Sequence, residues 1–354
     1  MSQSYRQRDS RNYLGEMKMK LSATLAALFM MSGAAQAAPD PIIDVHLHAQ
    51  PVAAYGPPGK HFCTPATAQM RAFDPAAGKS WPQEWMGRNM NPACEKSVPQ
   101  SVDDEALLRE TVEILERRNI IGVVGGHPDL VATWKAASPE HIIASRSFNL
   151  GRDADVTSEK LAEEFEAGAF EVLGEVTNQY VGVAPNDPRF DDYWALAEEK
   201  DFPVGIHIGG MPPGSAYMFE GARIALGDPF LLEDVLVKHP KLRVYMMHAG
   251  YPHVAKTIAM LRQYPQLYVE IGVLPVTMPR EEFHAFLERL VQAGHGDRVM
   301  YGSDQMIWPG IIEASIEAVA SADLTKKQKR DIFYNNAARF LRFDQETIDR
   351  HHGK

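Results

Sequence analysis

Short apolar runs alternate with amphipathic stretches along most of the chain. The runs are hydrophobic at consecutive positions, as in "IIGVVGG" at residues 120–126 and "LRVYMMHAG" at residues 242–250. Continuous hydrophobicity of this kind indicates strands that are covered on both faces, as in parallel sheets. The intervening stretches carry apolar residues at helical spacing and begin with capping residues, as "TSEKLAEEFEAG" does at residues 157–168. These features predict a regular succession of strands and helices.

Eight such pairs can be counted, and this number favours a (β/α)8 TIM barrel, with α/β as the fold class. A doubly wound sheet is the alternative, but eight regular units favour closure into a barrel. The first expected helix spans residues 101–119 with Ser101 as its cap, and an extra C-terminal helix is expected over residues 325–341. The predicted strands are residues 41–48, 120–126, 141–148, 170–176, 202–210, 242–250, 267–273 and 298–304.

Residues 49–100 interrupt this rhythm directly after the first predicted strand. The segment is rich in Pro, Gly, Ala and Asn but also contains Trp81 and Trp85. It is too long for an ordinary connection and too aromatic for a disordered linker, so it predicts a folded insertion or lid. Both cysteines of the chain, Cys63 and Cys94, lie in it. A disulfide between them is expected in an oxidising compartment, and two unpaired thiols are the alternative.

The first 37 residues have the pattern of a secretory signal peptide. Lys18 and Lys20 precede the apolar run "LSATLAALFM", and "AAQAA" offers small residues for cleavage after Ala37. A membrane anchor is the alternative, but the run is short for a span. We therefore expect a periplasmic or secreted protein whose single domain covers residues 38–354, with residues 325–354 as a C-terminal helix and tail.

The composition is globular, with 45% hydrophobic and 23% charged residues, and the formal net charge is −10. The first 37 residues hold five basic and two acidic side chains, so the remainder carries −13. Nucleic acid and anionic membranes both require a basic face, so this acidic body argues against either as a partner. A small-molecule substrate is expected instead.

Ionisable residues stand at the ends of five of the predicted strands, where burial makes them unusual. They are His46 and His48 on the first strand, Glu175 on the fourth, His207 on the fifth, His248 on the sixth and Asp304 on the eighth. In a barrel these ends share one rim, where active sites lie, and residues two apart on a strand point the same way. A single histidine here is more often a hydrogen-bonded structural residue, but the joint pattern predicts a metal site. Imidazole with carboxylate suits zinc, or iron, cobalt or manganese. An open position on such a metal binds water and lowers its pKa towards neutrality.

The segments "DVHLH", "GIHIG", "MMHAGYPH" and "MYGSD" resemble the motifs of the amidohydrolase superfamily. The resemblance is greatest to its amidohydrolase-2 branch, which includes aminocarboxymuconate semialdehyde decarboxylase and pyrone dicarboxylate lactonase. It extends from Pro41 to about Phe343 and implies one or two divalent metal ions, most often zinc, and a homodimer. By this resemblance the metal ligands are His46, His48 and His207, together with Asp304, which also shuttles the proton of the attacking water. His248 binds a second metal or polarises the substrate.

Glu175 is the ambiguous member of this set. The run "AFEVLGEVTNQ" contains no lysine, which excludes the variant of the superfamily with a carboxylated lysine on the fourth strand. The glutamate resembles the bridging glutamate of TatD-type deoxyribonucleases, which implies two metals. The alternative is a glutamate that only hydrogen-bonds the rim.

Three further residues are weaker candidates for substrate binding. Arg146 ends the third run and is able to clamp a carboxylate, although an ion pair at the rim is the alternative. Trp308 follows Asp304 and is expected to wall the pocket, with ordinary packing as the alternative. Tyr251 follows His248 and is expected to line the site or to cap the next helix.

These observations favour a metal-dependent hydrolase of an amide, ester or lactone, in which Asp304 and His248 are catalytic. The alternative is a non-oxidative decarboxylase of an aromatic or enoic acid with the same ligands. A non-catalytic periplasmic binding protein is a third hypothesis, which predicts no need for a metal.

Overall fold

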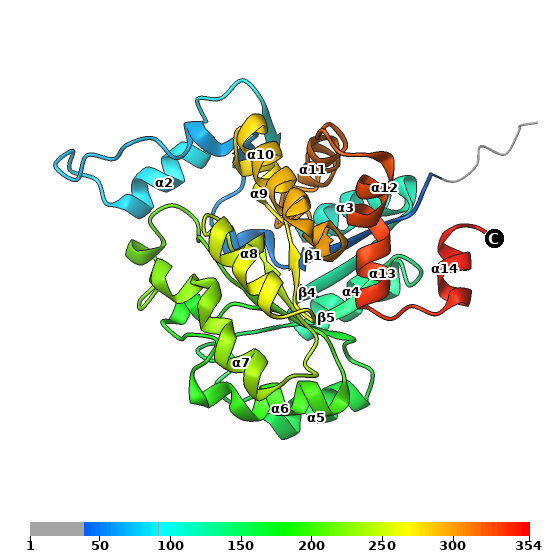
Figure 1. Cartoon of the computed structure of the whole chain (residues 1–354). Coiled ribbons are helices and arrows are strands. Elements are labelled where there is room, and N and C mark those ends of the chain that lie inside the picture. Colours follow the sequence, from blue (N-terminus) through cyan, green and yellow to red (C-terminus); the bar gives the residue numbers. More distant parts are fainter. Residues whose placement is uncertain (1–38, 91) are drawn as a thin grey trace, which may run out of the picture. The chain divides into compact units, whose positions relative to one another are not determined.

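Eight parallel strands form one sheet in the computed structural model, which describes residues 39–90 and 92–354 (Figure 1). The sheet order follows the chain, and each strand pairs with the next in parallel. The amide of Val45 donates to the carbonyl of Tyr301, and the amide of Asp304 to that of His46, so backbone bonds join the first strand to the segment after the last. The TIM barrel predicted from the sequence is therefore confirmed. Its strands are β1 (Ile42–Ala49), β4 (Ile120–Gly126), β5 (Ile142–Phe148), β6 (Val172–Val176), β7 (Val204–His207), β8 (Val244–Met247), β9 (Tyr268–Glu270) and β10 (Val299–Met300).

Helices follow the strands and cover the outside of the sheet (Figure 1). The fully buried outer side chains of the strands, such as Leu47 and Val244, pack against these helices in the main core. A second cluster, with Tyr245 of β8, packs against Phe340 near the C-terminus. The covering helices are α3 (Asp104–Arg118), α4 (Pro128–Ala137), α5 (Ser158–Glu166), α6 (Asp191–Lys200), α7 (Glu233–Lys238), α8 (Val254–Gln263), α9 (Leu274–Thr277), α10 (Arg280–Leu290) and α11 (Gly310–Ala320).

Two details of the helices differ from the sequence prediction. The cap of α3 is Asp103 and not Ser101, because the Asp103 carboxylate accepts from the amide of Ala106 while the Ser101 hydroxyl donates to Glu110. The extra C-terminal helix is present with a π-helical turn in its middle, and a further short helix follows it. These elements are α12 (Lys326–Arg330), η11 (Asp331–Asn335), α13 (Asn336–Phe340) and α14 (Gln345–His351).

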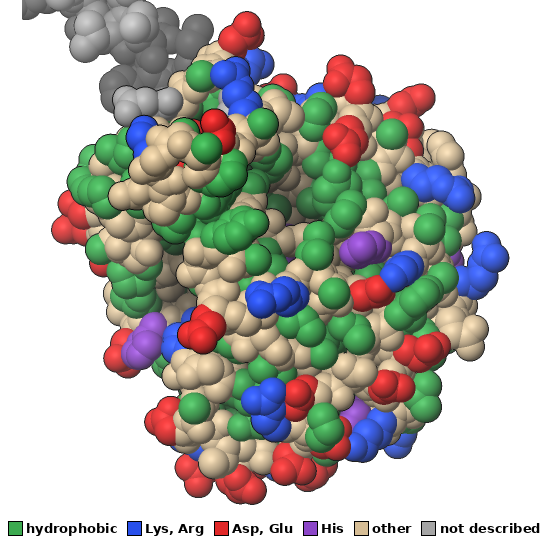
Figure 2. All heavy atoms as spheres, turned by 90° about the vertical axis from the view of Figure 1, so that its left-hand side faces the viewer, with side chains coloured by type: hydrophobic (Ala, Val, Ile, Leu, Met, Phe, Trp, Pro, Cys, Tyr) green, Lys and Arg blue, Asp and Glu red, His purple; other side chains and the backbone are tan. Residues whose placement is uncertain are grey.

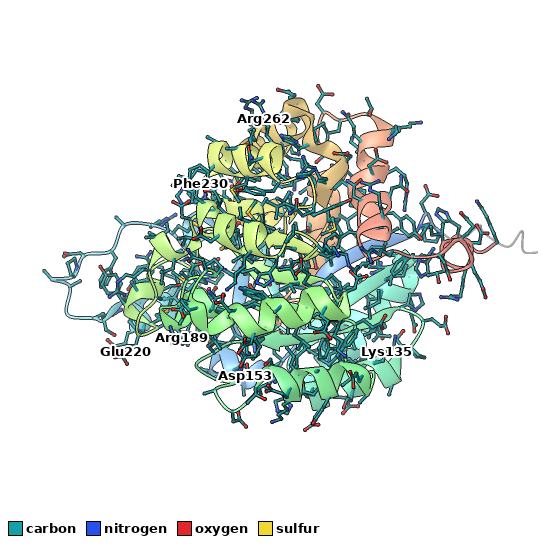
Figure 3. All side chains as sticks on the ribbon, turned by 60° about the horizontal axis from the view of Figure 1, so that its bottom comes forward. Lys135, Asp153, Arg189, Glu220, Phe230 and Arg262 are labelled. Atoms are coloured by element: carbon teal, nitrogen blue, oxygen red, sulfur yellow. A yellow bond between two sulfur atoms is a disulfide. The ribbon has the colours of Figure 1, made fainter. Side chains whose placement is uncertain are left out.

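The excursion, as we call residues 49–100, has short elements of its own. They are η1 (Val52–Tyr55), β2 (His61–Cys63), η2 (Ala66–Ala68), α2 (Trp81–Met90) and β3 (Ser97–Pro99). The strands β2 and β3 pair antiparallel, and the predicted disulfide between Cys63 and Cys94 is present. The indole N–H of Trp81 donates to the carbonyl of Pro213 at 2.8 Å, which ties α2 to the loop after β7. The excursion thus reaches over the rim where the strands end. In Figure 3, Glu220 of that loop lies at this end of the barrel, and Lys135, at the end of α4, lies at the other.

The predicted signal peptide, residues 1–37, lies outside the described residues. In the part that is described, no helix has both the length and the apolar character needed to cross a membrane.

Candidate metal centre

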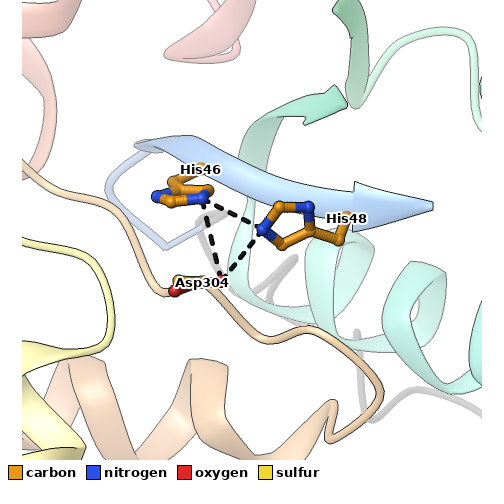
Figure 4. A group of neighbouring side chains, drawn as sticks. All are labelled: His46, His48 and Asp304. Atoms are coloured by element: carbon orange, nitrogen blue, oxygen red, sulfur yellow. Dashed lines mark hydrogen bonds and ion pairs between the residues drawn. The ribbon is translucent and has the colours of Figure 1, made fainter. Parts of the chain in front are cut away.

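His46 and His48 lie two apart on β1 and point to the same side of the strand (Figure 4). Their Nε2 atoms are 3.0 Å apart, and Oδ1 of Asp304 lies 3.0 Å from that of His48 and 3.7 Å from that of His46. The loop after β10 is fixed to β1 by Gln305, whose amide group accepts from the His48 N–H at 2.9 Å and donates to its carbonyl at 2.8 Å. The chain therefore holds two imidazoles and a carboxylate around one point.

Glu175, near the end of β6, faces this group with one carboxylate oxygen and a second group with the other. Its Oε2 lies 3.7 Å from Nε2 of His46 and 3.8 Å from that of His48. Its Oε1 lies 3.5 Å from Nε2 of His248 and 4.0 Å from that of His207. The structure thus brings together all six strand-end residues that the sequence singled out.

The spacing of these atoms fits a coordinated cation. Ligands about 2.1 Å from a tetrahedral zinc ion are about 3.4 Å apart. The distances measured among His46, His48, Glu175 and Asp304 range from 3.0 to 3.8 Å. Two separate sets of potential ligands result, one formed by His46, His48 and Asp304 and the other by Glu175, His207 and His248, and a third set, formed by His46, His248 and Glu270, overlaps both.

The second ring nitrogen of three of these histidines is occupied by a partner outside the cluster. Nδ1 of His46 lies 3.1 Å from a carboxylate oxygen of Glu270, and Nδ1 of His248 lies 3.0 Å from the carbonyl of Gly272. Nδ1 of His207 lies 2.9 Å from the side-chain oxygen of Gln179. Since all three partners are acceptors, each Nδ1 carries a proton and each Nε2 faces the cluster, where it offers its lone pair to a cation once it is deprotonated. Metal-binding histidines are oriented in this way.

The electrostatics of the cluster favour positive charge at its centre. Burial, and after it the neighbouring His248, lowers the pKa of His207 to about 3, which keeps this imidazole neutral. Burial also lowers the pKa of His46, but the charges of Asp304 and Glu270 outweigh it and raise that pKa well above its ordinary value. Burial raises the pKa of Glu175, but hydrogen bonds to His248 and His46 outweigh it and hold that pKa well below its ordinary range. A divalent cation satisfies the same preference.

Two half-buried tyrosines complete the surroundings of the cluster. The hydroxyl of Tyr180, which lies in η3 (Asn178–Val181) after β6, is 3.4 Å from Nε2 of His207. Tyr55, in η1 of the excursion, accepts from the side-chain amide of Gln50 at 3.1 Å. Burial, and the charges of Glu175 and Asp304, raise the pKa of both phenols, so they remain protonated. Trp308 packs against the Tyr55 ring, and the centroids of the two rings are 5.4 Å apart.

The structure does not bring Arg146 or Tyr251, two candidates for substrate binding, to the cluster, and for Arg146 it shows the alternative of an ion pair. Ser145 of β5 bonds the carbonyl of Gly174 inside the barrel, so Arg146, one residue on, points outward. There its guanidinium pairs with Asp153 at 3.2 Å and with Glu164 of α5 at 3.1 Å. The Tyr251 hydroxyl donates to Glu282 of α10 at 2.6 Å.

Sequence reasoning missed Glu270, Gln179 and the two tyrosines. Glu270 is fully buried at the end of β9 and is the only charged residue of the run "LYVEIGV". The signal that selected Glu175 was therefore present for Glu270 as well. Gln179, Tyr180 and Tyr55 lie on irregular segments, where no hydrophobic period indicates which side chains turn inward.

The parallel barrel and the imidazole–carboxylate cluster on its rim together define a (β/α)8-barrel protein with a candidate metal site. The chain belongs to the amidohydrolase family, because the family model described as Amidohydrolase matches residues 43–343. The members of this family are enzymes. The candidate metal site of this chain is consistent with membership in it. A search of curated proteins finds no match.

Solved structures share the fold at low sequence identity. An uncharacterised TIM-barrel protein from Bordetella bronchiseptica has a TM-score of 0.56 and 18% identity, over 89% of this chain and all of that one. A putative 2-pyrone-4,6-dicarboxylic acid hydrolase from Pseudomonas putida has a TM-score of 0.53 and 14% identity, over 86% of this chain and 98% of that one. A dihydroxybenzoic acid decarboxylase from a Polaromonas species, solved with manganese and the inhibitor 2-nitroresorcinol, has a TM-score of 0.53 and 13% identity, over 87% and 99%. Hydrolases and decarboxylases therefore both occur on this fold.

Proposed function

We propose that the protein is a metal-dependent hydrolase of a small molecule, which cleaves an ester, a lactone or an amide. The observation that carries the proposal is the convergence of Nε2 of His46, Nε2 of His48 and Oδ1 of Asp304, all within 3.7 Å of one another. The orientation of His46 by Glu270 supports it, because a structural histidine has no need to aim Nε2 at a second imidazole.

The ligands in this proposal are His46, His48, His207 and Asp304, with Glu175 between the two sets. The split of the Glu175 oxygens over two pairs of imidazoles favours a bridging role and accommodates one or two divalent cations. Imidazole and carboxylate donors suit zinc, and manganese is the main alternative.

The bound cation, Asp304 and His248 have separate roles in the proposed reaction. When bound, a divalent cation supplies Lewis acidity, which lowers the pKa of water and polarises a carbonyl oxygen. The Asp304 carboxylate accepts a proton from the attacking water, and the water oxygen forms a bond to the carbonyl carbon. The bond from that carbon to the leaving oxygen or nitrogen breaks, and Asp304 returns the proton to the leaving atom. Burial lowers the pKa of His248, but its hydrogen bond to Glu175 outweighs burial and raises that pKa, so Nε2 carries a second proton. His248, whose Nδ1 donates to Gly272, polarises the substrate carbonyl by donating this Nε2 proton in a hydrogen bond.

Non-oxidative decarboxylation on the same residues is the alternative reaction, and product analysis separates the two. In water labelled with heavy oxygen, a hydrolase places one labelled atom in the carboxylic acid product of each turnover and releases no carbon dioxide. Carbon dioxide release without incorporation of the label would contradict hydrolysis.

A further inference from the structure

Exposed hydrophobic side chains gather on two loops beside the candidate metal centre. Eight large hydrophobic side chains are exposed in the described part of the chain, and four of them lie between β6 and α6 or between β7 and Gly227, where the strands end at the rim. These four, which we call the apolar rim, are Val181, Tyr217, Phe219 and Ile224, with exposed fractions from 37% to 77%. A fifth exposed side chain, Phe230, follows in η7 (Pro229–Leu232). Scattered single hydrophobic residues need no explanation, but a group of them beside a site indicates a binding surface.

The apolar rim is continuous with the metal centre through Tyr180. This residue reaches Nε2 of His207 with its hydroxyl, while its ring packs edge to face against Phe219 with the centroids 5.2 Å apart. The two loops are in close contact, since a Cβ atom on Gly182 would lie 3.2 Å from the Cα atom of Gly221. In Figure 2, which faces the side that carries the excursion, hydrophobic side chains surround a hollow in the surface. An apolar path of side chains in contact therefore runs from the His207 imidazole through the Tyr180 ring to the exposed Phe219.

Positive charge is scarce along this path. Outside the excursion, the loops between strands and helices at this rim contain three arginines and no lysine. Arg152 and Arg189 pair with their neighbours Asp153 and Asp187, at 3.1 and 2.8 Å. Only Arg223 lacks an ion pair with a described residue at this rim, and it is exposed. When the carbonyl of a substrate lies at the metal centre, a carboxylate at its far end would lie along the apolar rim, where these loops offer no cation except the exposed Arg223 to neutralise it.

We propose that the substrates are uncharged esters or lactones that carry an apolar group, with the carbonyl oxygen bonded to Tyr180 and the apolar group along Phe219 and Ile224. This inference rests on the hydrolytic function proposed above and narrows it to a substrate class. Tyr180 is suited to its role because its hydroxyl has no other hydrogen bond among the described residues. Once a cation occupies the lone pair of His207, the phenol O–H is free to donate to a substrate carbonyl.

Binding of a matched pair of ketones tests this inference without turnover. The compounds 2-octanone and 7-oxooctanoate share a methyl ketone and chain length and differ in a terminal carboxylate. Calorimetry on the zinc-loaded and on the metal-free protein is expected to show at least about tenfold tighter binding of 2-octanone, because an unpaired charge is poorly tolerated on an apolar surface. Ile224→Ser is expected to weaken the binding of 2-octanone by about threefold to tenfold. Val237→Ser, a similar change at a side chain that is 66% exposed on α7, is the control and is expected to have no effect.

Tighter binding of 7-oxooctanoate, lost in Arg223→Ala, would overturn the inference. Equal effects of Ile224→Ser and Val237→Ser would also overturn it, because the apolar rim would then not be the binding surface. If 2-octanone binds as expected while no ester yields a carboxylic acid that carries labelled oxygen, the hydrolytic reaction fails and the binding preference stands. The variants Ile224→Ser and Val237→Ser both retain the buried core, because the two side chains are on the surface. Loss of folding therefore does not affect the comparison between them.

Discussion

A carboxylate oxygen of Glu270 lies 3.1 Å from Nδ1 of His46, while Nε2 of the same ring faces His48 and Asp304. Glu270 also accepts from the amides of His248 and Gly272, so one buried carboxylate holds an imidazole and the backbone of the neighbouring strand end. This arrangement fixes the Nδ1 proton of His46 and the direction in which its Nε2 points before any ligand arrives. The affinity of the centre for a cation therefore depends on Glu270, which need not itself be a ligand of the cation.

We expect Glu270→Gln to weaken zinc binding by about 10-fold to 100-fold, since loss of such an outer carboxylate lowers the basicity of the imidazole and frees its orientation. Competition with a zinc-binding dye measures the change. Glu282→Gln, at an exposed position of α10, is the matched control and should leave zinc affinity unaltered. Equal affinities of the two variants would contradict the role given to Glu270.

Asp304→Asn should lower kcat by about 100-fold to 10,000-fold, because the amide cannot accept the proton of the attacking water. The fold should be retained, as judged by circular dichroism, since the side chain is isosteric and lies at the rim. Asp297→Asn makes the same change at a side chain that is 71% exposed and should behave as the unaltered protein. An undiminished rate in Asp304→Asn would rule out Asp304 as the proton shuttle.

Zinc affinity should rise with pH. The acidic neighbours of His46 raise its pKa well above the ordinary value, so without a cation this imidazole holds a proton that zinc must displace. Displacement of one proton predicts an affinity that increases about tenfold for each unit between about pH 5 and 7. Calorimetry in two buffers of different ionisation enthalpy counts the protons released. Zinc binding without proton release would disagree with this description of the centre.

Gly214→Ala should loosen the excursion from the barrel. Gly214 has φ of +74°, and a Cβ atom there would lie 1.9 Å from the indole nitrogen of Trp81, so the indole would have to leave its bond to Pro213. We expect faster proteolysis within residues 81–90 and a shift in tryptophan fluorescence. Gly78→Ala is the matched control, because Gly78 lies in the same excursion and has a similar φ of +77°. A Cβ atom on Gly78 would have no neighbouring atom within 4 Å. If both variants are cleaved at the same rate, the contact with Trp81 does not hold the excursion.

The sequence predicted the barrel and the six strand-end residues for one physical reason. Parallel strands are buried on both faces, so ionisable side chains near their ends require a function or a partner. At His46 and His48 the spacing of two also indicates that both side chains share a face. The same reasoning applies to Glu270 and would have found it.

The directions of other side chains could not be predicted, because a strand that is apolar on both faces does not reveal which residues point inward. Arg146 illustrates this, since its neighbour Ser145 faces the barrel interior and the arginine turns to α5. Residues on irregular segments, such as Tyr55 and Tyr180, reach the cluster through the tertiary fold. No local pattern in the sequence reports such a contact.

The central claim is that separate strands of one chain converge on a cation, and anomalous diffraction from a zinc-loaded crystal tests it most directly. The account predicts an anomalous peak about 2.0–2.2 Å from Nε2 of His46 and His48 and from a carboxylate oxygen of Asp304. A map without a peak among these side chains, at full zinc loading and with the imidazoles turned away from one another, would contradict it.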